Sequence, residues 1–349
     1  MAARLSALNL CARQALLAAP LAALVACTAS EPPPAPEPPQ SARPEARPDL
    51  SAPAPDPTPD LAAMRQARAT TATTRNAAPQ SETSRQMARL FAGAQASFLA
   101  RGLMRQDREP KDAPFTADDL ARNFVQIALH DEYTRQNGRL VAQTRAAPLR
   151  RWQDPITMQV VFGNSVPDAQ RNRDGADIAG FAARLSSVSG HPIRMGQSGA
   201  NFVTLILSED ERRAIGPRLR QLVPDIPPAD IAAIQDLSAQ NYCTVFAYSR
   251  DGSAAYAKAV AVIRAELPDR LRLSCIHEEL AQGMGLANDS PAARPSIFND
   301  DEEFALLTRH DELLLKMLYD PRLRPGMTEA QATPIIRQIA GELIPRAAN

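Results

Sequence analysis

The 349-residue chain has few of the side chains from which metal and redox centres are usually built. It contains four histidines, four cysteines and one tryptophan, and only 5% of its residues are aromatic. An excess of positive charge is also lacking, because 39 lysines and arginines balance 39 aspartates and glutamates. Nucleic-acid-binding domains usually carry a basic surface. We therefore expect no nucleic-acid partner.

A long apolar run is missing from the N-terminus as well. The run at 15–26 follows Arg4 and Arg13 and ends at Cys27, and it is too short for a permanent transmembrane helix. A basic stretch, a short apolar core and small residues are typical of a signal peptide, here residues 1–26. Residues 24–27 resemble the bacterial lipobox, so we predict a lipid anchor on Cys27, with palmitate among its chains. Thr28 follows instead of Asp, which favours the outer membrane, facing the periplasm; ordinary secretion with a free Cys27 is the alternative.

Two cysteines remain for the mature domain, because Cys11 lies in the signal peptide and Cys27 is the predicted lipid site. In an oxidising compartment an even pair is more often a disulfide than a metal or catalytic pair. We predict a bridge between Cys243 and Cys275. It would pin the first part of the predicted helix 269–286, which contains Cys275, to a strand that contains Cys243.

Large apolar residues are scarce in residues 27–80, where Pro, Ala and charged residues dominate. Such a segment cannot bury enough surface to offset its chain entropy, so we predict a disordered, partly polyproline tether. A proline-recognising partner is the alternative role. We expect an amphipathic helix at 82–105, within a helix-and-linker segment at 81–113, and one globular domain at 114–349.

Periodicity within the globular domain predicts an α/β (α+β) fold with a mixed sheet packed against helices. The turn at 249–252 is typical of a hairpin. The predicted helices are 116–128, 177–189, 209–222, 228–237, 269–286, 310–319 and 329–343, and the predicted strands are 139–143, 156–162, 201–207, 243–248 and 255–263.

The predicted helix 269–286 contains a pattern similar to the metzincin signature H-E-x-x-H-x-x-G-x-x-H, which implies a zincin-like fold. Aligned on Gly285, this pattern puts Glu278, Gln282 and Asn288 at the ligand positions and Glu279 at the general base. All three ligand histidines are therefore replaced. His277 lies one residue too early, about 100° around the helix.

This donor set decides the expected chemistry. Zinc prefers imidazole, thiolate and carboxylate, whereas amide oxygens suit harder cations such as calcium. We expect no tight zinc site, and zinc or calcium remain candidate metals without an assigned ligand set. Leu280, Met284 and Leu286 could equally define a buried structural helix that ends at Gly285.

From Pro114 to about Met327 the chain resembles an uncharacterised family of bacterial lipoproteins, the domain of unknown function 2927. This family has Glu-Glu-x-x-Gln where peptidases have His-Glu-x-x-His, and the resemblance implies no established activity. The residues that carry it are Leu149–Pro155, Val161–Gly163, Glu278–Gln282 with Gly285, Asn288–Asp289, Ser296–Asp300 and Leu318–Met327.

The acidic run 299–303 is a further candidate, because it could approach the cleft formed by Glu278, Glu279, Gln282, Asn288 and Asp289. The simpler interpretation is a solvated helix start. Clustered carboxylates bind calcium or divide acid and base roles.

Three functions follow from these patterns. The first is a membrane-anchored, periplasm-facing module that binds an envelope protein or peptidoglycan, or serves a structural role. The second is a metal-dependent hydrolase of peptides or cell-wall material that uses Glu279 as general base. The third is a metal-free hydrolase that uses Glu278 and Glu279 with Asp300 or Asp301.

Overall fold

The computed structural model describes residues 78–136, 139–250 and 252–345. The predicted signal peptide, Cys27 and nearly all of the predicted tether lie outside these residues. No helix within the described ranges is both long and apolar enough to cross a membrane.

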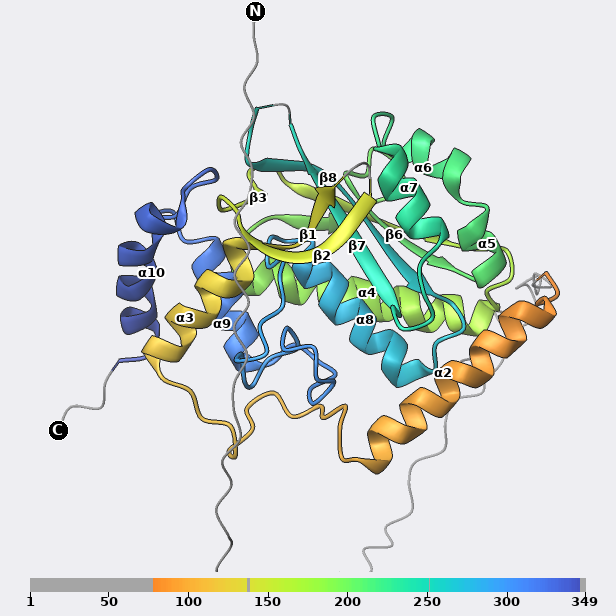
Figure 1. The fold of residues 1–349 in the computed structure, drawn as a ribbon, viewed down its shortest axis with the longest axis horizontal. Coiled ribbons are helices and arrows are strands. Elements are labelled where there is room, and N and C mark those ends of the chain that lie inside the picture. The colour runs from red at the N-terminus through yellow and green to blue at the C-terminus, as the bar shows by residue number, and fades with distance from the viewer. Residues whose placement is uncertain (1–77, 137–138, 251, 346–349) are drawn as a thin grey trace, which may run out of the picture. The chain divides into compact units, whose positions relative to one another are not determined.

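The domain is built on a six-stranded sheet with strand order β3-β8-β6-β4-β5, and β7 pairs with β8 as well (Figure 1). The pairs are parallel except for β7, which runs antiparallel to β8. All six residues of β6 are buried, as expected for a central parallel strand covered on both faces. The strands are β3 Arg151–Trp152, β4 Ile156–Phe162, β5 Ile193–Met195, β6 Phe202–Leu207, β7 Cys243–Ser249 and β8 Ala255–Arg264.

Helices cover both faces of this sheet. Alternate residues of β6 and β8 separate into two apolar clusters, because successive side chains of a strand point to opposite faces. One cluster packs against α4 (Asp168–Ser189) and α8 (Asp269–Gln282), and the other packs against α6 (Gly216–Leu222) and α7 (Pro228–Gln235). The other helices are α2 Glu82–Ala100, α3 Ala117–Ala128, α5 Glu209–Arg213, α9 Arg309–Leu318 and α10 Glu329–Leu343.

A separate antiparallel hairpin, formed by β1 (His130–Gln136) and β2 (Arg139–Ala146), lies outside the main sheet. The hairpin follows α3 directly, and β2 contacts α7. It therefore leads from α3, which packs in the first apolar cluster, to α7, which packs in the second.

Helix α2 packs on the domain, a point that the sequence left open. The Phe91 side chain is fully buried, and its ring meets the ring of Tyr242 edge-on with 5.8 Å between centroids. The Ser84 hydroxyl donates a hydrogen bond of 2.5 Å to the carboxylate of Glu266. The helix ends at Ala100 instead of Arg105.

The structure confirms the predicted α/β class with a mixed sheet packed with helices, and most predicted elements lie within a few residues of their predicted bounds. Helix α4 begins at Asp168 instead of 177, and the predicted helix 209–222 is interrupted between α5 and α6. The strands β1, β3 and β5 were not predicted. Two- and three-residue strands such as β3 and β5 carry too little periodicity to be recognised.

Candidate functional site

Helix α8 presents different sides to the core and to a cavity, as the helical period requires. His277 faces the core, where its ring stacks on Phe181 with 3.9 Å between centroids and its Nδ1 accepts a hydrogen bond from the Leu307 amide. Burial, with a smaller effect of Arg184, lowers the pKa of His277 to about 3. His277 is therefore a neutral core residue and does not face the cavity with Glu279.

The turn after α8 is fixed by its neighbours. The helix ends at Gln282, three residues earlier than the predicted stop at Gly285. The indole of Trp152 donates a hydrogen bond of 2.8 Å to the carbonyl of Gly283, and the Tyr319 hydroxyl donates one of 2.9 Å to the carbonyl of Met284. Gly285 has φ of 124°, a conformation that favours glycine. The chain therefore reverses here and brings Asp289 back beside the end of the helix.

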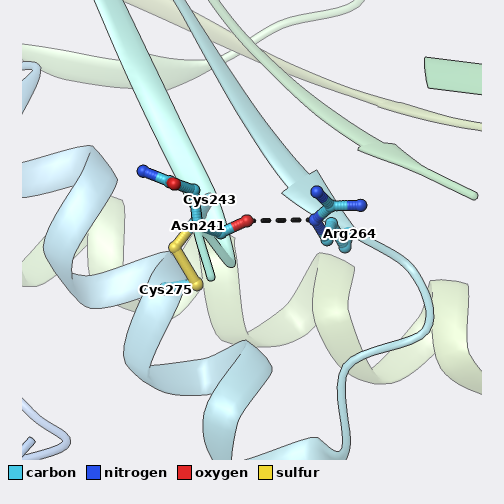
Figure 2. The surroundings of a disulfide bond; sticks show 4 residues. All are labelled: Asn241, Cys243, Arg264 and Cys275. Atoms are coloured by element: carbon cyan, nitrogen blue, oxygen red, sulfur yellow. Dashed lines mark hydrogen bonds between the residues drawn. A yellow bond between two sulfur atoms is a disulfide. The ribbon is translucent and has the colours of Figure 1, made fainter. Parts of the chain in front are cut away.

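The predicted disulfide between Cys243 and Cys275 is present, with 5.9 Å between the Cα atoms. Figure 2 shows that it joins the start of β7 to α8. Beside it, Arg264 Nε donates a hydrogen bond of 3.0 Å to the carbonyl of Asn241, which also holds the segment that leads into β7.

A cavity of about 960 Å³ lies beside this disulfide. Every residue of β7 lines it, together with the segment 236–242 that precedes the strand. Other parts of its wall come from the start of β1, the end of β2, α8 and the segments around 289 and 300. Secondary-structure elements that are far apart in sequence thus meet at one cavity.

The lining of this cavity is strongly acidic. Only Arg145 and Arg150 bring positive charge, and Arg150 is paired with Asp131, whose second carboxylate oxygen accepts a hydrogen bond of 2.9 Å from it. The acidic residues of the lining are Asp131, Glu132, Asp236, Glu278, Glu279, Asp289, Asp300 and Glu302.

Burial and mutual repulsion raise the pKa values of the central carboxyls. Burial is the main cause at Glu278, where Glu279 and Asp289 add to it, and the pKa of Glu278 is well above the ordinary value. The pKa of Glu279 is raised well above that value by burial, Glu132 and Asp289. Burial, Glu132 and Asp300 raise the pKa of Asp289 to about 7, and burial beside Asp300 and Asp301 raises that of Glu302 to about 7. Holding all four charges close together is therefore unfavourable unless protons or a cation neutralise them.

Glu279 is the most deeply buried of these acids, with 4% of its surface exposed. Its Oε2 has no hydrogen-bond partner among the described residues. One carboxylate oxygen of Glu278 and one of Glu279 lie within 4.8 Å of each other and of the Cys243 sulfur. That sulfur belongs to the disulfide and is therefore not a thiolate ligand.

The other predicted cleft residues separate into two groups. Gln282 and Asp289 line the cavity, and the Gln282 amide donates a hydrogen bond of 3.4 Å to Asp289. Asn288 is buried outside the lining, where its amide donates bonds of 2.8 Å to the carbonyls of Gln126 and Asp289. The three metzincin ligand positions thus supply one carboxylate and two amides that are used in other hydrogen bonds, a set that does not fit zinc.

Two acids from the run 299–303 reach the cavity. Asp300 and Glu302 line it, and both have a φ of 59°. The segment is irregular, so the interpretation of this run as a helix start is wrong. Glu303 points to Arg105 and Arg294 instead.

Sequence reasoning missed Glu132, Asp131 and Asp236 as lining residues. Glu132 lies on the unpredicted strand β1, and Asp236 lies at the end of α7. Neither belongs to a recognisable motif, so only the packing of the hairpin and α7 around the cavity could reveal them.

The fold and the site define a mixed α/β protein with an acidic cavity between an edge strand and a disulfide-linked helix. Within this class, the family described as "Protein of unknown function (DUF2927)" matches residues 117–338, and the chain belongs to this family. The match contains every residue of the cavity lining. Neither the curated proteins nor the solved structures contain a significant match to the chain.

Proposed function

We propose that this chain is a membrane-anchored binding module of the cell envelope, held at the outer membrane by a lipid on Cys27 and facing the periplasm. Its partner is an envelope protein that inserts an extended segment into the acidic cavity along β7. The single observation that carries this proposal is the position of β7, which lines the cavity along its whole length.

Strand addition suits β7 because it pairs with β8 along one edge, and no described strand pairs with its other edge. An extended segment can use such an edge for main-chain hydrogen bonds, while alternate side chains supply specificity. The acids opposite the strand favour a segment that carries lysine or arginine, because complementary charge speeds association and selects partners.

Isomeric N-methylated peptides test strand addition directly. Basic eight-residue peptides would first be selected from a display library on the full chain in detergent. Methyl groups would then be placed on alternate backbone amides in two sets. We expect one set to abolish binding and the other to leave it nearly unchanged, because only every second amide of an added strand faces β7. Equal loss in both sets, or binding of peptidoglycan fragments instead of peptides, would contradict the proposal.

The second candidate function is a metal-dependent hydrolase of peptides or cell-wall material, with Glu279 as general base. It is favoured by the pKa of Glu279, which is raised well above the ordinary value, and by its unpartnered Oε2, because a carboxylate with a raised pKa is a stronger base toward a bound water molecule. The metal would not be zinc, because Glu278, Gln282 and Asn288 do not supply the ligands that zinc prefers.

The two functions separate on one substitution. The hydrolase requires Glu279→Gln to abolish cleavage of the selected peptides or of peptidoglycan. The binding module requires the same peptides to remain intact after long incubation with the unmodified chain, as judged by mass spectrometry.

A further inference from the structure

The carboxylates of Glu278, Glu279 and Asp289 line the same cavity near the end of α8. Oxygens of Glu278 and Glu279 lie within 4.8 Å of each other although adjacent helical residues diverge by about 100°. The two long glutamate side chains therefore bend toward each other. Asp289 adds to the negative charge that raises the pKa values of both.

No arginine, lysine or histidine of the described residues forms an ion pair with Glu278, Glu279 or Asp289, since Arg150 is paired with Asp131. Oxygens of one calcium coordination shell lie up to about 5 Å apart, because each is about 2.4 Å from the ion. The 4.8 Å limit that contains the Glu278 and Glu279 oxygens fits this distance. The Oε2 of Glu279 is buried and has no hydrogen-bond partner among the described residues.

We infer that Glu278 and Glu279 hold one hard divalent cation, with Ca²⁺ preferred, against the wall formed by α8, and that Asp289 binds this ion through a water molecule. This inference goes beyond the proposed function, because it requires no peptide and no catalysis. The ligands are all oxygens, and the cavity leaves room for the waters that complete a shell of six to eight ligands, as calcium takes. Zinc favours imidazole and thiolate ligands. No histidine belongs to this group, and the Cys243 sulfur is not a thiolate because it forms the disulfide.

The direct test is metal binding to the full chain in detergent after removal of metals with a chelator. Isothermal titration with CaCl₂, MgCl₂, MnCl₂ and ZnCl₂ should show one equivalent of Ca²⁺ bound, more tightly than Mg²⁺ or Zn²⁺. Glu278→Gln and Glu279→Gln should each weaken Ca²⁺ binding at least tenfold, and Asp289→Asn should weaken it less. Glu303→Gln, in the neighbouring acidic run but paired with Arg105 and Arg294, should leave it unchanged.

Terbium luminescence gives a second measurement that does not depend on these variants. Tyr242 lines the cavity and should sensitise bound Tb³⁺. We expect Ca²⁺ to displace the signal, and Tyr242→Phe to reduce it without changing the Ca²⁺ affinity.

Absence of Ca²⁺ binding up to about 10 mM would overturn the inference, as would unchanged affinity in a folded Glu279→Gln variant. Tighter binding of Zn²⁺ than of Ca²⁺ would also overturn it. These outcomes leave the peptide proposal standing, because the N-methylation test reports on β7 and not on these carboxylates.

Discussion

The disulfide between Cys243 and Cys275 joins edge strand β7 to helix α8 three residues before Glu278. Two walls of the acidic cavity are therefore covalently linked beside its central carboxylates. The distance between β7 and α8 is therefore fixed by the disulfide as well as by packing. The cavity should keep its width when it binds a ligand.

Removal of the disulfide should lower the stability of the domain. Cys243→Ser with Cys275→Ser opens a link across a sequence separation of 32, and loop-closure entropy predicts a loss of about 3–4 kcal/mol in the free energy of unfolding. Urea denaturation of the double variant and the unmodified chain measures this loss. A reducing agent should lower the stability of the unmodified chain alone. A thiol count on the unfolded, unreduced chain that finds both cysteines free would contradict the bridge.

The neighbouring acids Glu302 and Glu303 should respond to pH in opposite ways. Burial raises the pKa of Glu302 to about 7, so the folded state holds a proton that the unfolded state loses above about pH 4.5. The stability of the fold therefore falls as pH rises from about 4.5 through about 7, where Glu302 ionises in the folded state. Glu302→Gln should stabilise the chain by about 2 kcal/mol at pH 8 and by much less at pH 5, as measured by denaturation with chelator present.

Glu303→Gln is the matched control. Hydrogen bonds from Arg294, with burial opposing them, lower the pKa of Glu303. Its charge therefore stabilises the fold above the unfolded pKa, and this contribution is lost as pH falls through the folded pKa. The substitution should cost about 1 kcal/mol near neutral pH, a small value because Arg294 is exposed. Equal pH profiles for the two variants would contradict the opposite shifts.

Gly285 should not tolerate a side chain. A Cβ atom there would lie 2.4 Å from the carbonyl oxygen of Arg150, and the positive φ is unfavourable for other residues. Gly285→Ala should therefore cost more than about 2 kcal/mol. Gly341→Ala is the control. Gly341 lies in α10, and a Cβ atom added there would meet no side chain or neighbouring element within 4 Å, so this substitution should be neutral or stabilising. Thermal melting of both variants checks this difference.

Cys27→Ser should release the protein from the membrane. Two or more acyl chains give stable anchoring, and the predicted anchor attaches all of them through Cys27. Membrane fractionation with an antibody to the folded domain would show the variant in the soluble periplasmic fraction. Membrane retention of the variant would contradict the anchor, and Cys11→Ser should leave fractionation unchanged.

Local sequence determined most elements of this protein. Apolar periodicity placed α3 and α10, and the apolar run 202–207 placed the central strand. The even cysteine pair, together with the oxidising compartment that the predicted signal peptide implies, predicted the disulfide, and the structure contains it. Glu278, Glu279 and Gln282, which the metzincin-like pattern singled out, all line the cavity.

Tertiary structure decided the rest of the site. Asp289 reaches the cavity and Asn288 does not, because the turn held by Trp152 and Tyr319 determines which residue faces inward. Glu302 joins the cavity from a segment that the sequence could assign equally to a helix start. The raised pKa values depend on burial and on neighbours from distant elements. Local propensity acts over a few residues, whereas burial and charge proximity are set only when the whole chain has folded.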